Sequence, residues 1–197
     1  MSSLASMDNE IFFQGVKGLL DEGHDVTIKV VGRSMEPFFR SHKDEIRLSP
    51  IPSGFWDEAE TDGGVWTWKK KRGAVGSFVL ARIQPDGKYV AHRIVAIHDG
   101  MIIMRGDGNV FGTEKAYFDD VLAFVTAYRR GRGRQFHELA GSRLWRIYSR
   151  AWMRTGHLPR RVLLALWHYV VCPMFPSLGS AKENVKANDA GHNLNDK

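Results

Sequence analysis

The sequence predicts a mainly β protein, with one helix before a compact antiparallel β unit and a basic helical region after it. Between about residues 25 and 130, short β-branched runs alternate with tight-turn signals such as Pro85-Asp86-Gly87 and His98-Asp99-Gly100. Beyond residue 137 the hydrophobic pattern changes to helical spacing. A hydrophobic fraction of 43% in 197 residues is enough for one core.

The individual elements follow from local patterns. A helix is expected over residues 8–22, where apolar side chains recur at helical spacing and Gly23 supplies a stop. Strands are expected over residues 26–31, 44–49, 76–83, 89–97, 101–105 and 121–128, a turn-rich loop over 50–64, and a strand or loop over 65–69. The predicted division is an N-terminal helix (1–24), a β unit (25–130), a basic, aromatic-rich helical extension (137–176) and a disordered tail (177–197).

Composition excludes several classes of protein. A single cysteine, Cys172, excludes an internal disulfide framework and a cysteine-built metal site, and no cofactor is expected. The N-terminus lacks the basic segment and continuous apolar run of a signal peptide. No window reaches the ~18 to 20 apolar residues of a spanning helix. We therefore expect a cytoplasmic protein, or a peripheral one at a membrane surface.

The net charge of +6 is concentrated near the C-terminus. Residues 129–161 hold ten arginines and one glutamate, a charge of +9, which leaves −3 for the rest of the chain. The helical part alternates arginines with aromatic residues: Arg143, Arg146, Arg150, Arg154, Arg160 and Arg161 with Trp145, Tyr148, Trp152, Trp167 and Tyr169. Such a segment can pack its aromatic stripe on the β unit, lie on a membrane surface or bind nucleic acid. Of these three interpretations, packing on the β unit is favoured most and binding to nucleic acid least.

A serine stands at a sharp corner in the stretch VVGRSMEPFF, residues 30–39. A serine hydroxyl becomes an effective nucleophile when a base lies within hydrogen-bond reach and backbone N–H groups face the developing oxyanion. Gly32 permits close backbone approach and Pro37 fixes the chain after the turn. Ser34 is therefore a candidate nucleophile, although most corner serines only cap a turn.

The candidate base is His92, which lies inside the apolar strand YVAHRIVAI. Histidine titrates near neutral pH, and a buried histidine needs a polar partner. Asp107, in the corner RGDGN after the next strand, is the expected acidic partner of the imidazole. Each residue also has an ordinary structural interpretation. His92 can be a core histidine that is hydrogen-bonded to a carbonyl, and Asp107 can belong to a simple Asp-Gly turn. Glu114, Asp119 and Asp120 follow closely and leave the identity of the acid open.

Taken in order, GRSMEP, GSFVLA, AHRIV and RGDGN resemble the motif set of the signal peptidases, whose wider superfamily includes the LexA-type self-cleaving repressors. The resemblance covers about residues 26–125. It is closest to the endoplasmic-reticulum-type branch, in which histidine replaces the lysine base. Two departures are Ser77, where the family usually has aspartate after glycine, and the missing N-terminal membrane anchor.

The resemblance implies a coiled, mostly antiparallel β barrel and a serine endopeptidase. Ser34 would be the nucleophile, His92 the general base and Asp107 the acid, while Gly32 and Met35 would belong to the oxyanion turn. The implied substrate is a leader-bearing peptide or precursor protein, and no metal is implied. A LexA-like self-cleaving regulator and a non-catalytic barrel that binds peptides or membranes are the alternative interpretations.

Overall fold

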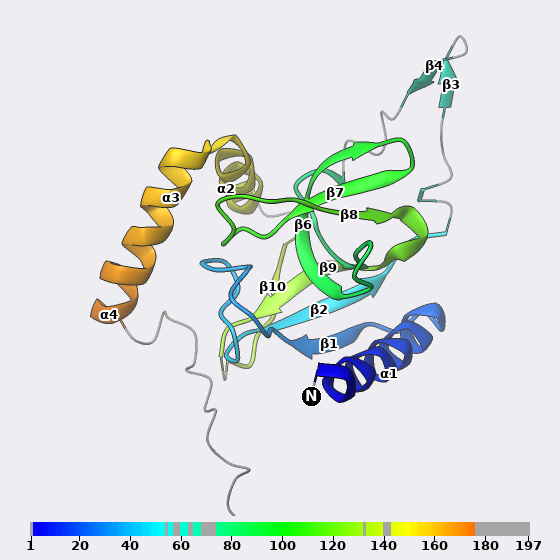
Figure 1. Ribbon diagram of the computed structural model, residues 1–197, viewed down its shortest axis with the longest axis horizontal. Coiled ribbons are helices and arrows are strands. Elements are labelled where there is room, and N and C mark those ends of the chain that lie inside the picture. Colours follow the sequence, from blue (N-terminus) through cyan, green and yellow to red (C-terminus); the bar gives the residue numbers. More distant parts are fainter. Residues whose placement is uncertain are drawn as a thin grey trace, which may run out of the picture.

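The computed structural model describes residues 2–53, 55–56, 60–62, 65–67, 74–131, 133–139 and 143–175, so the predicted tail lies outside the described residues. The fold is mainly antiparallel β, with one sheet curled into a half-barrel and helices around it (Figure 1). The sheet has eight strands in the order β1-β2-β9-β5-β6-β7-β8, with β10 pairing on β9. The strands are β1 (Val26–Lys29), β2 (Glu45–Pro50), β5 (Phe78–Arg82), β6 (Tyr89–His98), β7 (Met101–Arg105), β8 (Glu114–Tyr117), β9 (Val121–Arg129) and β10 (His137–Glu138).

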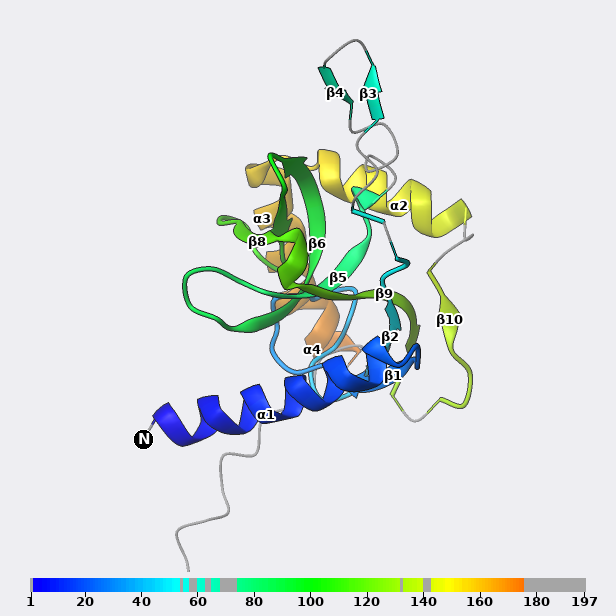
Figure 2. The same cartoon turned by 90° about the vertical axis from the view of Figure 1, so that its right-hand side faces the viewer.

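Most strands lie where the sequence predicts them, because each is a local β-branched or apolar run. A separate hairpin, β3 (Glu60–Asp62) with β4 (Val65–Thr67), projects away from the sheet in both views (Figures 1 and 2). Three strands were not predicted, and the first of them, β3, falls in the predicted loop over residues 50–64. β8 is four residues with little apolar character, and β10 falls in the segment from His137 that was predicted to be helical.

Two hydrophobic clusters make up the core. One includes Phe38 and Phe39 from the chain between β1 and β2, and it receives α1 (Ser2–Asp21) through Val16 and Leu20. The other is built around the β5–β6–β7–β8 part of the sheet and includes Ile94. The first cluster therefore anchors the segment that carries Ser34 as part of the core.

The C-terminal helices pack on the side of the sheet away from α1 (Figure 2). They are α2 (Arg143–Arg154) and a continuous helix made of α3 (His157–Leu166), a π-helical turn η3 (Trp167–Val171) and α4 (Cys172–Met174). The aromatic side of α2 faces the β unit, where Trp145 and Trp152 both contact Phe38. Among the residues that the structure describes, no helix combines the length and apolarity needed to cross a bilayer.

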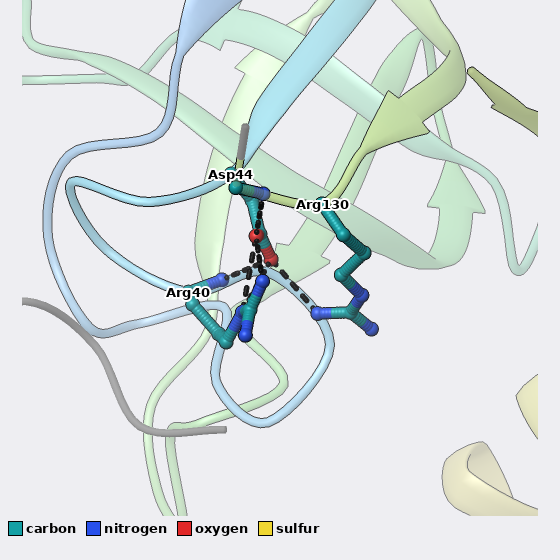
Figure 3. A network of polar contacts seen from close by, with 4 residues as sticks. Arg40, Asp44 and Arg130 are labelled. Carbon is teal, nitrogen blue, oxygen red and sulfur yellow. Dashed lines mark hydrogen bonds and ion pairs between the residues drawn. The ribbon is translucent and has the colours of Figure 1, made fainter. Parts of the chain in front are cut away.

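The residues between β1 and β2, numbers 30–44, form what we call the serine loop, and a buried carboxylate closes it. Asp44 accepts hydrogen bonds from the backbone N–H and guanidinium of Arg40, from Arg130 and from the backbone N–H of Gly131 (Figure 3). The backbone carbonyl of Asp44 also accepts from the N–H of Val30. Asp44 thus ties both ends of the loop to the end of β9.

This carboxylate gives the fold a defined dependence on pH. Burial alone would raise the pKa of Asp44, but hydrogen bonds from Arg40 and the charge of Arg130 outweigh burial and hold the pKa below its usual value. A pKa that is lower in the folded than in the unfolded chain stabilises the fold above the unfolded value. That stabilisation disappears as the pH falls through the folded value.

We expect Asp44→Asn to lower the free energy of unfolding at pH 7 by about 3 kcal/mol, because Arg40 and Arg130 lose a buried counter-charge. The difference from wild type should shrink only as the pH falls below the ordinary aspartate pKa of 3.8 and through the lower pKa of folded Asp44, since the wild-type carboxylate is protonated over that range. Urea unfolding at several pH values measures both quantities. A difference that stayed constant across this range would show that the charge of Asp44 is not what stabilises the loop.

Candidate active site

Ser34 is held at a tight turn within the serine loop. Gly32 has a φ of +89°, a conformation that favours glycine, and its N–H donates to Ser41 Oγ at 3.0 Å. The N–H of Glu36 donates to the carbonyl of Arg33 across the turn, and the Met35 side chain is buried in the core. These contacts leave Ser34 half-buried, with its hydroxyl directed at the sheet.

His92 approaches this hydroxyl from the middle of β6. It pairs with Val79 of β5, and only 3% of the residue is exposed. Its Nε2 lies 2.9 Å from Ser34 Oγ. The sequence prediction that Ser34 and His92 meet is therefore realised in the geometry, across 58 residues of chain.

The second nitrogen of the imidazole faces a carboxylate. His92 Nδ1 lies 2.8 Å from Glu114 Oε2, and 28% of the Glu114 side chain is exposed. An ionised carboxylate only accepts, so Nδ1–H donates to Glu114 and Nε2 is left to accept from the serine hydroxyl. The result is a hydrogen-bonded chain from Glu114 through His92 to Ser34, the arrangement that activates a serine nucleophile.

The sheet register explains why Glu114 occupies this place. Ile94, Met104 and Glu114 are direct partners across β6, β7 and β8, so their side chains share one face. His92 is two residues from Ile94 on β6 and shares that face as well. Reading the four-residue stretch EKAY as a strand would have turned Glu114 inward with Ala116, which is the signal that sequence analysis missed.

Asp107, the predicted acid, does not contact the imidazole, and that assignment is corrected here. Its carboxylate accepts from Arg93 Nε at 2.9 Å and from Arg93 Nη2 at 2.6 Å. Arg93 follows His92 on β6 and therefore points to the opposite face of the sheet. Asp107 and Arg93 are 2% and 1% exposed, so they form a buried ion pair beside the site instead of the acid of a triad.

The corner between β7 and β8, residues 106–113 and hereafter the β7–β8 loop, lies directly against the serine turn. The N–H of Gly108 donates to the carbonyl of Ser34 at 2.7 Å. A Cβ atom built on Gly106 would lie 2.5 Å from that carbonyl and 3.1 Å from His92 Nε2. The two glycines of RGDGN are therefore required by close packing, which fixes the serine turn relative to the histidine.

Two backbone donors are available near the hydroxyl. Within the part of the chain that the structure describes, the N–H groups of Ser34 and Met35 donate to no protein acceptor. Amides of this kind can stabilise an oxyanion that develops next to Ser34. The N–H of Gly32 is already engaged with Ser41, so of the two predicted oxyanion-turn residues only Met35 has a free amide, and Gly32 shapes the turn.

The helix α3 contacts the site from outside. His157 Nδ1 lies 3.0 Å from the carbonyl of Val110, and Arg160 Nη1 donates to the carbonyl of Asn109 at 3.4 Å. Burial, together with the charge of Arg105, lowers the pKa of Arg160 to about 10, so the guanidinium is still a cation at neutral pH. Both contacts end on the β7–β8 loop, so this helix supports the loop that packs on Ser34.

A pocket of about 590 Å³ lies elsewhere, between α2 and strands β5 and β9, where Phe78, Trp145 and Met153 line it. Neither Ser34 nor His92 contributes to its lining. We therefore give this pocket no part in the chemistry of the site.

Glu114→Gln should lower kcat by about 10²- to 10⁴-fold with little change in KM, because a neutral amide no longer stabilises the imidazolium that forms during catalysis. Glu114 acts through His92, so substrate binding should be spared. The matched control is Asp119→Asn, an exposed acid five residues further along, which should retain wild-type kcat. Equal kcat values for both variants would remove Glu114 from the mechanism.

Compared with models of protein families, with curated proteins and with solved structures, the chain shows no significant match.

Proposed function

We propose that the chain is a serine endopeptidase of the signal-peptidase type, acting on a leader-bearing peptide or precursor protein. The observation that carries the proposal is the hydrogen-bonded chain from Glu114 through His92 to Ser34. The order of the motifs GRSMEP, GSFVLA, AHRIV and RGDGN along a curled antiparallel sheet supports the signal-peptidase type. That the curled sheet is the coiled barrel of the signal-peptidase family is also part of this proposal.

The geometry supports a two-step acyl transfer. His92 Nε2 accepts the hydroxyl proton as Ser34 Oγ attacks the peptide carbonyl carbon, and the carbonyl oxygen becomes an oxyanion facing the N–H groups of Ser34 and Met35. The imidazolium then gives its proton to the departing amine as the C–N bond breaks. Water, deprotonated by His92, adds to the acyl-serine ester, and release of the carboxylic acid restores the hydroxyl.

A comparison of protein N-termini in producing cells tests the proposal. Cells carry the wild-type protein, Ser34→Ala or His92→Ala, and N-terminal peptides are identified by mass spectrometry. We expect a defined set of N-termini that is present with wild type and absent with both variants. Their sequences give the cleavage rule. Identical profiles from folded wild type and variants would overturn the peptidase function.

Intact mass separates cleavage of a substrate from cleavage of the protein itself. Purified wild type incubated at raised pH should keep its full mass if it acts on other chains. A LexA-like regulator would instead yield two fragments whose formation requires Ser34. Fragmentation of this kind would replace the precursor-processing proposal with self-cleavage.

A further inference from the structure

One side of the continuous α3–η3–α4 helix is exposed and almost entirely apolar. Leu158 is 77% exposed and Tyr169 is 81% exposed. On the opposite side, Arg160 and Leu164 are buried against the rest of the protein. We call the exposed side the α3 face, and its members are Leu158, Val162, Leu163, Leu166, Tyr169, Val170 and Met174.

Spacing shows that these residues form one surface. They recur at intervals of three, four and one residue over about four helical turns, so they lie along one side of the helix. Single exposed apolar residues are ordinary, but a contiguous apolar stripe on a water-soluble surface marks a binding site. Figure 1 shows this helix as the outermost element on its side of the molecule, where no other described element covers it.

The exposed charges beside the α3 face are cationic, and a buried carboxylate lies under them: Glu36, 1% exposed, pairs with Arg33 at 3.4 Å and lies 3.5 Å from His168 Nδ1. Arg161 is exposed on the same helix, and Arg33 of the serine loop donates to His168 Nδ1 at 2.8 Å, which places its guanidinium beside η3. The sequence contains no aspartate or glutamate between Glu138 and Glu183. An apolar face edged by cations is complementary to a surface that is apolar within and negative at its rim.

The α3 face also adjoins the catalytic loops. Phe111 of the β7–β8 loop stacks on His157, with ring centroids 5.2 Å apart, and is itself exposed. Arg33 is the residue before Ser34. The apolar face and the serine turn therefore open on the same side of the molecule.

We propose that the α3 face docks on an anionic lipid bilayer, with its apolar side chains in the interface and Arg33 and Arg161 at the headgroups. A second copy of the chain is a poorer occupant, because a two-fold contact would bring Arg161 of both copies to one interface, and Glu36, the acidic residue at this edge, is buried and already pairs with Arg33 of its own chain. Nucleic acid would leave the apolar side chains facing phosphates.

Vesicle binding tests the docking. The protein carries Ser34→Ala so that cleavage cannot affect the result, and it is mixed with phosphatidylcholine vesicles with or without about one-third phosphatidylglycerol, then separated by flotation. We expect binding to the anionic vesicles, weakened by high salt because exposed charges are screened. The triple variant L158Q/V162Q/L166Q should lower the partition coefficient by about tenfold or more, since three apolar side chains no longer enter the interface.

A matched control replaces three other exposed apolar residues, which lie on another helix. Ile11, Phe12 and Leu19 are exposed on α1, a helix that carries acidic residues, and I11Q/F12Q/L19Q should bind as the parent does. The parent and the two triple variants are compared by circular dichroism to establish that they fold alike. Retained binding in the α1 variant together with loss in the α3 variant supports the proposal.

Three results would overturn it: no binding to anionic vesicles, equal loss in both triple variants, or a dimer in light scattering that only the α3 variant converts to a monomer. The last result would show that the α3 face binds a second copy of the chain. Because the vesicle assay uses an inactive serine variant, its failure leaves the peptidase proposal standing. Failure of the N-terminal peptide comparison likewise leaves the docking standing.

Discussion

Replacing Ser34 with alanine is expected to lower kcat by about 10⁴-fold or more, because the acyl-enzyme route is removed and only binding and the oxyanion donors are left. His92→Ala should have an effect of similar size, since the serine hydroxyl then has no base at 2.9 Å. The double variant should lose little more than either single variant, because the two side chains act as one unit. The substrate for these rates is the precursor peptide identified by the N-terminal comparison.

The measurement is kcat and KM for wild type and the three variants, with circular dichroism and thermal unfolding to establish folding. A useful control is Ser77→Ala, which changes a serine on the neighbouring strand segment outside the hydrogen-bonded chain and should leave kcat within about twofold of wild type. Turnover that persisted in Ser34→Ala would exclude a serine acyl-enzyme. Losses that multiplied in the double variant would indicate that the two residues act independently.

Asp107→Asn should have the largest effect on stability, lowering the free energy of unfolding by about 3 to 5 kcal/mol because Arg93 would be left as a buried, unpaired cation. The guanidinium also lies 4.1 Å from the ring centroid of Phe78 and donates to Ser149 Oγ at 2.7 Å, so it cannot move to solvent without disturbing the core. The pair joins the β7–β8 loop to β6. The substitution should therefore act on folding first and on activity as a consequence.

Urea unfolding at pH 7 provides the free energies, and Glu138→Gln serves as the control. Glu138 is half-exposed and pairs with Arg47 at 2.9 Å, and breaking such a surface pair should change stability by less than about 1 kcal/mol. The double variant Arg93→Met/Asp107→Leu should recover part of the loss, because no uncompensated charge is left inside. If Asp107→Asn proved as stable as wild type but lost activity selectively, Asp107 would return as a catalytic candidate.

Local sequence predicted much of the fold and two of the three residues of the hydrogen-bonded chain. Ser34 stands in a turn whose shape depends on neighbours such as Gly32 and Pro37, and His92 stands in a strand with an apolar pattern of its own. Both features are contained in about ten residues. Short-range chemistry is therefore enough to single them out.

The acidic partner of His92 could not be identified from local sequence, because which carboxylate faces the imidazole depends on how distant strands pair in the sheet. His92 and Arg93 are adjacent and point to opposite faces, so a shift of one residue would exchange their partners. Asp107 is closer than Glu114 to His92 and Arg93 in the sequence, and it lies in the RGDGN corner that resembles a known motif. Glu114, by contrast, begins a polar four-residue strand. Only the pairing of β7 with β8 places Glu114 in the row beside His92.

The strand order has a consequence for when the hydrogen-bonded chain of Ser34, His92 and Glu114 can form. Ser34 follows β1, and His92 lies on β6, and among the described strands of the sheet β9 joins the β1–β2 half to the β5–β6 half. β9 spans Val121–Arg129 and comes after every residue of the hydrogen-bonded chain. During synthesis, a nascent chain that ends before β9 contains Ser34, His92 and Glu114 without the strand that joins their two parts of the sheet. The hydrogen-bonded chain is therefore expected to form only after β9 has been made.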